Sequence, residues 1–320
     1  MSIKNFIKSN KLLFTLANYF YSPIRLKKIR DNDKMYYKEL EKYTILANHA
    51  KKTKTEITIN PENIIIKVHD HRKFYFYPDK KHCILRIQEN GNYEPEETYL
   101  MNIITTNKDV IIDIGANFGW FTTLFANKVK PIGHVHSFEP IPETFEELKR
   151  NIELNNISKY VTLNNLALGE NNGNIKMYLP STYGSAFASF KSHGKNDCNE
   201  YTCRMIKLDD YIKEKKLNVA DIKLIKCDVE GAELLVLRGA RDILKSPDAP
   251  IWLMEVSEVW TKDFGYHPVD LLNFMTENNY KIYYLKDNKI CKLISYVNLD
   301  LNNLLFIKQN VHLSLLQKLF

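Results

Sequence analysis

The sequence predicts an α/β protein built on a doubly wound, mostly parallel sheet of seven strands, with an N-terminal extension of helices and a β-hairpin. From about residue 108 onward, short apolar runs alternate with segments whose apolar residues recur every three or four positions. The short runs indicate buried strands, and the recurring pattern indicates amphipathic helices. Strands separated by helices in this way favour a parallel sheet with helices on both faces.

The N-terminal part of the chain lacks this alternation. Apolar residues recur at helical spacing over 3–20, and a second helix is expected over 34–48. β-branched and aromatic runs separated by turn-forming pairs then indicate a small antiparallel sheet. We therefore expect a basic helical extension over 1–54, an antiparallel β region over 55–90 and an α/β domain over 91–320.

Seven runs in the α/β domain have the composition of strands: 110–114, 134–139, 160–168, 222–230, 250–256, 280–285 and 304–308. Helices are expected between them over 118–128, from Pro142 to Ile152, from Leu234 to Leu244 and over 268–278. Pro142 favours a helix start because its fixed φ suits the first turn. Residues 170–207 interrupt the alternation, and we expect an insertion there with two hairpin strands and a loop.

The composition excludes several classes of protein. Hydrophobic residues make up 44% of the chain and charged residues 26%, which is typical of globular proteins and not of disordered ones. No run of 18 or more apolar residues occurs, so no membrane-spanning helix is expected. The five cysteines are scattered without C-x-x-C spacing. This argues against a disulfide framework and a zinc site, and favours free thiols in the cytoplasm.

The positive charge is concentrated at one end of the chain. Residues 1–60 carry 13 Lys and Arg against 5 Asp and Glu, a net charge of +8, whereas the whole chain carries +7. This distribution argues against a chain-wide nucleic-acid surface. The basic segment is either a solvated helical face or a contact for anionic lipid or acidic glycan, which would hold a cytoplasmic protein at the inner face of the membrane.

Four strands of the predicted sheet end in an acidic residue: Asp113, Glu139, Asp228 and Glu255. Ligands of such sheets bind beyond the carboxyl ends of the strands, so these side chains are candidates for a binding site. Asp and Glu also cap helix N-termini, and capping is the alternative for Asp113 and Asp228.

The loop after the first strand predicts a nucleoside-containing cofactor. Residues 115–119 read GANFG, which allows the backbone to approach a ligand closely. Glu139 lies 20 residues beyond Gly119, a spacing that suits ribose hydroxyls. A dinucleotide would place its pyrophosphate beside Asp113, and two like charges 4 Å apart at an effective dielectric near 20 cost roughly 4 kcal/mol. S-adenosylmethionine carries a sulfonium and an ammonium instead, so we predict this cofactor rather than NAD.

Several segments together resemble the FkbM family of class I methyltransferases. They are DIGANFG (113–119), FEPIP (138–142) with FEELKRN (145–151), LALG (166–169), LDDY (208–211), IKCDVEGAELLVLRGA (225–240) and Glu255-Val256. Their order and spacing match over about residues 90–285, and D-I-G-A-N-x-G with K-x-D-V-E-G-A-E is a highly specific combination. The resemblance implies a Rossmann-like fold and O-methylation of a polyketide or carbohydrate hydroxyl.

The resemblance also implies roles for individual residues. Those along the methionine part of the cofactor would be Asp113, Gly115, Asn117 and Gly119. Glu139 would hold the ribose hydroxyls, and Ala167 would meet the adenine edge through its backbone. The segment 93–97 would close over the methionine end with Glu94 or Glu97 as the contact. The alternative for these two residues is an acidic helix N-terminus.

By the same resemblance Asp228 would lie near the methyl group. A hydroxyl acceptor needs a base, which typically contributes about 10²–10⁴-fold. The candidate bases are Asp228, Glu230, Glu255, His193 and His267, of which we select Asp228, Glu255 and His267.

The turn DVEG after the fourth strand lacks the proline pair and aromatic residue found in amino-group methyltransferases. We interpret Asp209 as a helix cap rather than as a metal ligand beside Asp210 and Asp228, and expect no metal.

We predict an S-adenosylmethionine-dependent O-methyltransferase that acts on a hydroxyl of a sugar or glycan in the synthesis of a surface polysaccharide. Aromatic side chains expected near the acceptor support a sugar, because flat rings suit the apolar faces of sugars. They are Trp120, Trp252, Trp260, Tyr183, Phe264 and Tyr266. The alternatives are O-methylation of a polyketide or other small-molecule hydroxyl, and a non-catalytic binding module that keeps the methyltransferase fold.

Overall fold

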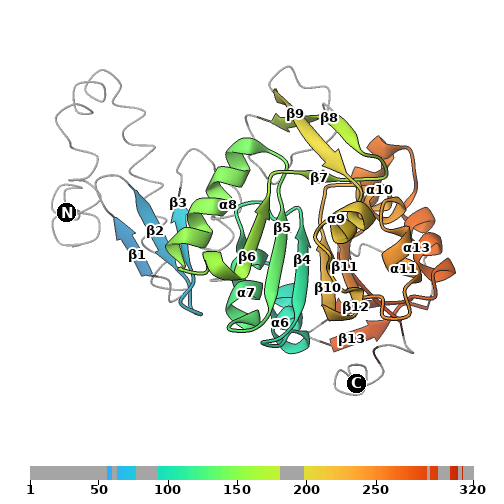
Figure 1. The fold of residues 1–320 in the computed structure, drawn as a ribbon, viewed down its shortest axis with the longest axis horizontal. Helices are drawn as coiled ribbons and strands as arrows, with labels where there is room; N and C mark the ends of the chain where they lie inside the picture. The colour runs from blue at the N-terminus through green and yellow to red at the C-terminus, as the bar shows by residue number, and fades with distance from the viewer. Residues whose placement is uncertain are drawn as a thin grey trace, which may run out of the picture. The chain divides into compact units, whose positions relative to one another are not determined.

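Figure 1 shows the computed structural model, which describes residues 56–59, 63–76, 93–180, 198–286, 289–294, 303–308 and 312. The chain divides into two compact units, Met1–Tyr93 and Glu94–Phe320. The expected helices over 3–20 and 34–48 lie outside the described residues, so the division into three segments stays a prediction. No helix within the described part has the length and apolar character needed to cross a membrane.

The described part of the first unit is an antiparallel sheet in the order β1-β2-β3. Its strands are β1 (Glu56–Ile59), β2 (Ile64–Lys67) and β3 (Lys73–Phe76). Alternate side chains of β2 and β3 are buried, among them Ile66 and Phe74. A period of two is the pattern of a strand with one covered face.

The second unit contains a sheet of eight strands in the order β13-β12-β14-β11-β10-β4-β5-β6. The strands are β4 (Val110–Ile114), β5 (His134–Phe138), β6 (Val161–Asn164), β10 (Ile222–Cys227), β11 (Ile251–Glu255), β12 (Lys281–Lys286), β13 (Lys289–Lys292) and β14 (Asn303–Ile307). The five from β11 to β6 run parallel, whereas β14 is antiparallel to β11 and β12. The predicted doubly wound, mostly parallel fold is confirmed, and β13 adds an eighth strand at the edge.

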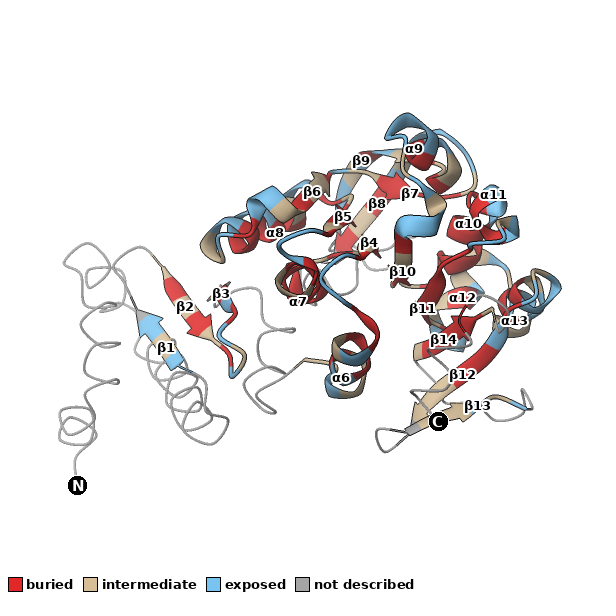
Figure 2. Ribbon diagram, turned by 60° about the horizontal axis from the view of Figure 1, so that its bottom comes forward, coloured by how far each residue is buried: buried red, intermediate tan, exposed pale blue. Residues whose placement is uncertain are grey.

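Helices lie on both faces of this sheet (Figure 1). They are α6 (Pro95–Ile104), α7 (Trp120–Val129), α8 (Pro142–Leu154), α9 (Leu208–Glu214), α10 (Glu233–Arg238), α11 (Arg241–Lys245), α12 (Glu258–Thr261) and α13 (Pro268–Glu277). Strands β4 and β11 are nearly continuous apolar runs, as expected for strands with both faces covered. Figure 2 shows their buried residues in red and the exposed residues on the outer sides of the helices.

The third predicted strand is shorter than expected. β6 ends at Asn164, and Ala167 lies in β7 (Ala167–Leu168), which belongs to a separate sheet. The chain turns at Asn165, whose Nδ2 donates hydrogen bonds to the backbone oxygens of Glu139 and Pro140 at 2.9 and 3.0 Å. These bonds fix the chain beside the end of β5 instead of continuing β6.

The predicted insertion contains the expected hairpin. β8 (Gly173–Pro180) pairs antiparallel with β9 (Cys198–Ile206), and β9 pairs in parallel with β7. Residues 181–197 between the hairpin strands, including His193 and Tyr183, lie outside the described residues.

Candidate active site

The four predicted carboxylates lie at the carboxyl ends of neighbouring parallel strands. Asp113 is in β4 opposite Lys226 of β10, Glu139 follows β5, Asp228 follows β10, and Glu255 ends β11. The structure thus brings all four to the edge at which ligands of this fold bind. We call this edge, with the loops that follow its strands, the acidic edge.

The loop after β4 lies directly against the loop after β10. Gly115 has a φ of +76°, and a Cβ at this position would lie 1.8 Å from the backbone oxygen of Asp228. Only glycine can occupy this position without moving one of the two loops. Gly119 precedes α7 with a φ of +96°, and Asn117, also at positive φ, accepts a hydrogen bond from the Phe118 N–H at 2.8 Å through Oδ1.

Asp113 is fully buried, and its two oxygens differ. Oδ2 accepts a hydrogen bond from the Thr122 hydroxyl at 2.5 Å, whereas Oδ1 is buried without a hydrogen-bond partner among the described residues. Burial raises the pKa of this carboxyl, although the nearby Lys226 opposes the rise. A buried carboxylate oxygen without a donor is a good acceptor for a cationic or N–H-bearing ligand.

Glu139 is held by two backbone N–H groups. Its Oε2 accepts from Asn117 and its Oε1 from Ile141, each at 3.0 Å. Burial raises its pKa to about 7, against the effect of both hydrogen bonds. A carboxylate has about four acceptor sites, so these bonds fix the side chain and leave capacity for two ribose hydroxyls.

Lys226 is the site residue for which sequence reasoning gave no role. Its side chain is buried, and its Nζ lies 2.8 Å from Asp228 Oδ2 and 4.7 Å from the centre of the Phe121 ring. Asp228, Glu94 and Asp113 raise its pKa against the opposing effect of burial. The sequence did contain a signal for this role. Lys226 lies in a mostly apolar strand, and its spacing of two residues from Asp228 puts both side chains on the same face.

The DVEG turn after β10 is fixed by α10. Glu233 Oε1 accepts hydrogen bonds from the N–H groups of Val229 and Gly231 at 2.9 and 3.3 Å. The Tyr266 hydroxyl donates to the backbone oxygen of Gly231 at 2.7 Å. A Cβ on Gly231 would lie 2.6 Å from the backbone oxygen of Trp260, so the chain after β11 packs tightly on this turn.

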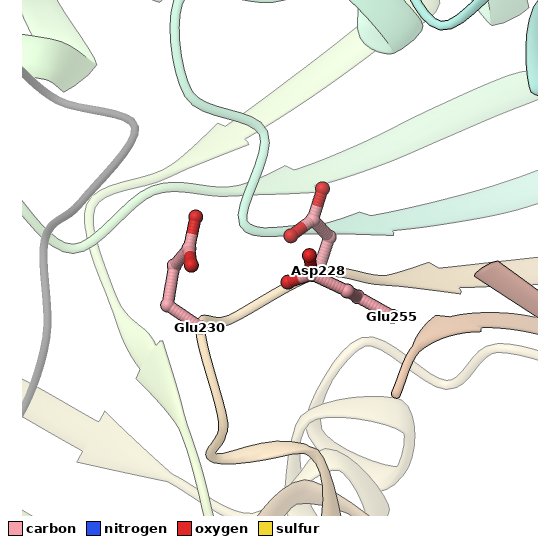
Figure 3. A group of neighbouring side chains, drawn as sticks. All are labelled: Asp228, Glu230 and Glu255. Carbon is pink, nitrogen blue, oxygen red and sulfur yellow. The ribbon is translucent and has the colours of Figure 1, made fainter. Parts of the chain in front are cut away.

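Three carboxylates meet at this turn. One oxygen from each of Asp228, Glu230 and Glu255 lies within 4.8 Å of the other two (Figure 3). Burial and the neighbouring negative charges raise the pKa of Glu230 to about 9 and that of Glu255 well above its usual value. Like charges this close need protons or a bound cation to remain together.

The segment before α6 also reaches the acidic edge. Glu94, with a φ of +46°, and Glu97 both interact electrostatically with Lys226. Glu97 Oε1 accepts a hydrogen bond from Asn303 Nδ2 at 3.0 Å, and burial raises its pKa. Both predicted contacts are therefore near the site.

His267 follows β11, as predicted, but its side chain caps α13. Its side chain is exposed, its Nδ1 accepts the Val269 N–H at 3.2 Å, and its own N–H donates to Asp270 Oδ2 at 2.8 Å. These reciprocal bonds form a capping box at the start of α13. The ring nitrogen used for capping is unavailable as a proton acceptor, so we withdraw His267 as a base.

Two further interpretations need correction. Asp209 does act as a cap, but for α11 rather than for its own helix, since its carboxylate accepts the N–H groups of Asp242 and Ile243 at 2.9 and 3.1 Å. Trp120 and Trp252 are 1% and 0% exposed, so these two rings belong to the core and are closed to a sugar.

The Methyltransferase FkbM domain family matches residues 113–282. Methyltransferase 1 of Beauveria bassiana is 32% identical over 148 residues, covering 41% of this chain and 58% of the relative. The 31-O-demethyl-FK506 methyltransferase FkbM of Streptomyces tacrolimicus is 30% identical over 161 residues, covering 42% and 60%. Hexuronic acid methyltransferase AglP of Haloferax volcanii is 28% identical over 138 residues, covering 43% and 52%. The matches thus span little more than half the length of these relatives.

Among solved structures, the SAM-dependent O-methyltransferase of Thermotoga maritima is similar at a TM-score of 0.37 and 12% identity, covering 79% of this chain and 85% of that one. The fold class rests on the strand order described above rather than on this similarity. The family match covers just over half of the chain and includes both of its most specific motifs. The chain belongs to the FkbM family of class I methyltransferases, whose methyl donor is S-adenosylmethionine, as its motifs predict.

Proposed function

We propose that this chain transfers a methyl group from S-adenosylmethionine to a hydroxyl of a sugar or glycan. The observation that carries the proposal is the acidic edge, where four carboxylates lie at the ends of neighbouring strands. Two loops of this edge approach each other closely, at Gly115 and Asp228. A site lined with carboxylates favours a cationic ligand and disfavours a phosphate.

The donor side of the site is assigned to Asp113, Glu139 and the loop 115–119. Asp113 Oδ1, buried without a donor, suits the positively charged methionine end, and Glu139 has acceptor capacity for the ribose hydroxyls. By the family resemblance we assign the adenine edge to the backbone of Ala167, which lies in β7 just after the turn at Asn165.

When bound, S-adenosylmethionine supplies an electrophilic methyl group, whose bond to sulfur breaks as the acceptor oxygen bonds to the methyl carbon. The residues of the chain must hold these atoms in line and accept the hydroxyl proton. Asp228 and Glu255 are the assigned proton acceptors. Lys226 fixes Asp228 through Oδ2. Burial and neighbouring negative charges raise the pKa of Glu255, so this residue accepts a proton only in its ionised form.

The acceptor is assigned from two lines of support. One relative is named a hexuronic acid methyltransferase, and three partly exposed aromatic residues follow β11 beside the DVEG turn: Trp260, Phe264 and Tyr266. The second candidate is a polyketide hydroxyl, favoured by the relative named for 31-O-demethyl-FK506. A role in surface-polysaccharide synthesis and contact of residues 1–60 with an anionic surface remain part of the proposal.

The test is transfer of labelled methyl from S-adenosylmethionine by the full chain to two sets of acceptors. One set contains neutral sugars, uronic acids and oligosaccharides, and the other contains polyketides with free hydroxyl groups. Labelled, alkali-stable product in the sugar set alone supports the proposal. Product in the polyketide set alone would replace the sugar by the second candidate, and no product with either set, together with no binding of S-adenosylhomocysteine, would favour a binding module.

A further inference from the structure

We propose that Asp228, Glu230 and Glu255 form a binding site for one divalent metal ion of the Mg²⁺, Mn²⁺ or Ca²⁺ type. The inference rests on the proposed function only in placing that ion beside the acceptor, and in the metal-bound protein it changes the role of Asp228 and Glu255 from proton acceptors to ligands of the ion. Asp228 and Glu230 come from the DVEG turn, and Glu255 comes from the end of strand β11 (Figure 3).

The spacing of the three oxygens suits a single ion. Each residue offers one oxygen within 4.8 Å of the other two. Ca²⁺ binds oxygens at about 2.3–2.6 Å and Mg²⁺ at about 2.0–2.1 Å, so two oxygens on one ion lie at most about 4–5 Å apart. The oxygens lie near this limit, so they can share an ion once the side chains move slightly toward one another.

A second, independent observation concerns Glu255 alone. Its Oε2 is buried and has no hydrogen-bond partner among the described residues, although the carboxylate reaches toward Asp228 and Glu230 (Figure 3). A buried carboxylate oxygen without a partner is costly because it has lost its water. An ion between the three groups supplies the missing partner.

The local charge also favours a cation. The three carboxylates lie near two further acids, Glu94 and Glu233, whereas the cation among them is Lys226, which pairs with Asp228 Oδ2 at 2.8 Å. When ionised, the cluster therefore carries an excess of negative charge that a divalent ion would offset. Carboxylate oxygens are the ligands that Mg²⁺, Mn²⁺ and Ca²⁺ prefer, and the positions that the protein does not fill are open to water or to acceptor hydroxyls.

The turn is built to keep these ligands in place. Glu233 binds two backbone N–H groups of the turn, and Tyr266 binds the Gly231 carbonyl. Glu230 adopts a φ of +52°, a left-handed backbone. Such a conformation persists only where the surroundings fix it, and the Glu230 side chain lies beside Asp228 and Glu255 (Figure 3).

The experiment is a titration of the full chain, freed of metal by a chelator, with MnCl₂ while free Mn²⁺ is followed by electron paramagnetic resonance. The variants are Glu230→Gln and Glu255→Gln. The matched control is Glu258→Gln, which changes an exposed acid in α12 that pairs with Lys262 at 2.9 Å. Thermal unfolding establishes that each variant is folded, and S-adenosylhomocysteine binding is measured in parallel.

We expect one Mn²⁺ per chain, displaced by Mg²⁺ or Ca²⁺. Loss of even an outer partner of a metal ligand costs about 10- to 100-fold in affinity, so each ligand variant should bind at least about 10-fold more weakly while the control binds as the wild type does. Absence of Mn²⁺ binding at millimolar concentration, or unchanged binding by Glu255→Gln, would overturn the proposal. If S-adenosylhomocysteine still binds in that case, the metal site fails and the methyltransferase function stands.

Discussion

Two groups of carboxylates at the acidic edge differ in what holds them. Asp113 and Glu139 accept hydrogen bonds from a hydroxyl and from backbone N–H groups. Asp228, Glu230 and Glu255 instead face one another, and Lys226 is bound to one of the three. The first group is positioned by the fold itself, whereas the second group is stable only with protons or a cation. The difference fits the roles proposed above, with Asp113 and Glu139 on a preformed donor side and the other three carboxylates on a reacting side whose charge depends on its ligand.

The largest loss of methyl-transfer activity is expected from a change at Asp228, on the reacting side. Asp228→Asn keeps an oxygen that can accept from Lys226 but removes the negative charge, so the rate of methyl transfer should fall by about 10²–10⁴-fold. Binding of S-adenosylhomocysteine should change little, because the donor side is unaltered. The measurement is methyl transfer at saturating donor, with Glu153→Gln on the exposed face of α8 as the control. A fully active Asp228→Asn protein would show that Asp228 neither accepts the proton nor orients the acceptor.

The contact between the two sides is tested at Gly115. Gly115→Ala places a methyl group 1.8 Å from the Asp228 carbonyl and should destabilise the protein and abolish S-adenosylhomocysteine binding. Gly265→Ala is the matched control, since its φ of +74° is similar and nothing lies within 4 Å. The control should cost only the roughly 1–2 kcal/mol of a left-handed backbone and leave binding intact.

Urea unfolding and calorimetry measure both variants. Equal losses in the two proteins would mean that the close approach of the loops has no energetic consequence. A larger loss in Gly115→Ala confined to stability, with binding unchanged, would separate the loop contact from the donor site.

The charge of the second group is tested by pH. Burial and neighbouring charges raise the pKa of Glu230 to about 9 from 4.5. Between these values the folded chain holds a proton that the unfolded chain has released, so the free energy of unfolding should fall as pH rises. Glu230→Gln should flatten this dependence in metal-free protein, as measured by urea unfolding from pH 5 to 9. An identical slope in the wild type and the variant would contradict the raised pKa.

The smallest effect on activity and stability is expected from replacing His267. His267→Ala removes the cap of α13 and should lower stability by about 1 kcal/mol, with methyl transfer unchanged because the side chain is exposed and directed at its own helix. Thermal unfolding and initial rates test both parts. A fall in rate comparable to that of Asp228→Asn would restore His267 as the base.

The sequence predicts which strand ends supply the acidic side chains of the site, because strand ends are marked by local patterns. An apolar run followed by an acid marks the end of a buried strand, and this rule places Asp113, Glu139, Asp228 and Glu255 at one edge. The glycine at 115 is predicted as a place of close approach. Its neighbour is the Asp228 carbonyl. This contact depends on how β4 and β10 pair, which a local sequence pattern does not predict.

What the sequence does not predict depends on contacts distant along the chain. Asp209 caps a helix more than 30 residues away, and Trp252 is buried because neighbouring layers cover β11. The cluster of Asp228, Glu230 and Glu255 requires a left-handed residue at 230 that no motif identifies. Lys226 was visible in the K-x-D spacing, but its burial among the acids became evident only in the structure.

The most direct measurement is a calorimetric titration of the full chain with S-adenosylmethionine and S-adenosylhomocysteine, in the wild type and in Asp113→Asn. We expect both ligands to bind the wild type and to bind the Asp113→Asn variant more weakly. The loss should be larger for S-adenosylmethionine, because only this ligand carries the sulfonium charge. Absence of binding by the wild type at millimolar ligand, or equal affinities in the wild type and the variant, would contradict the assignment of the acidic edge as the donor site.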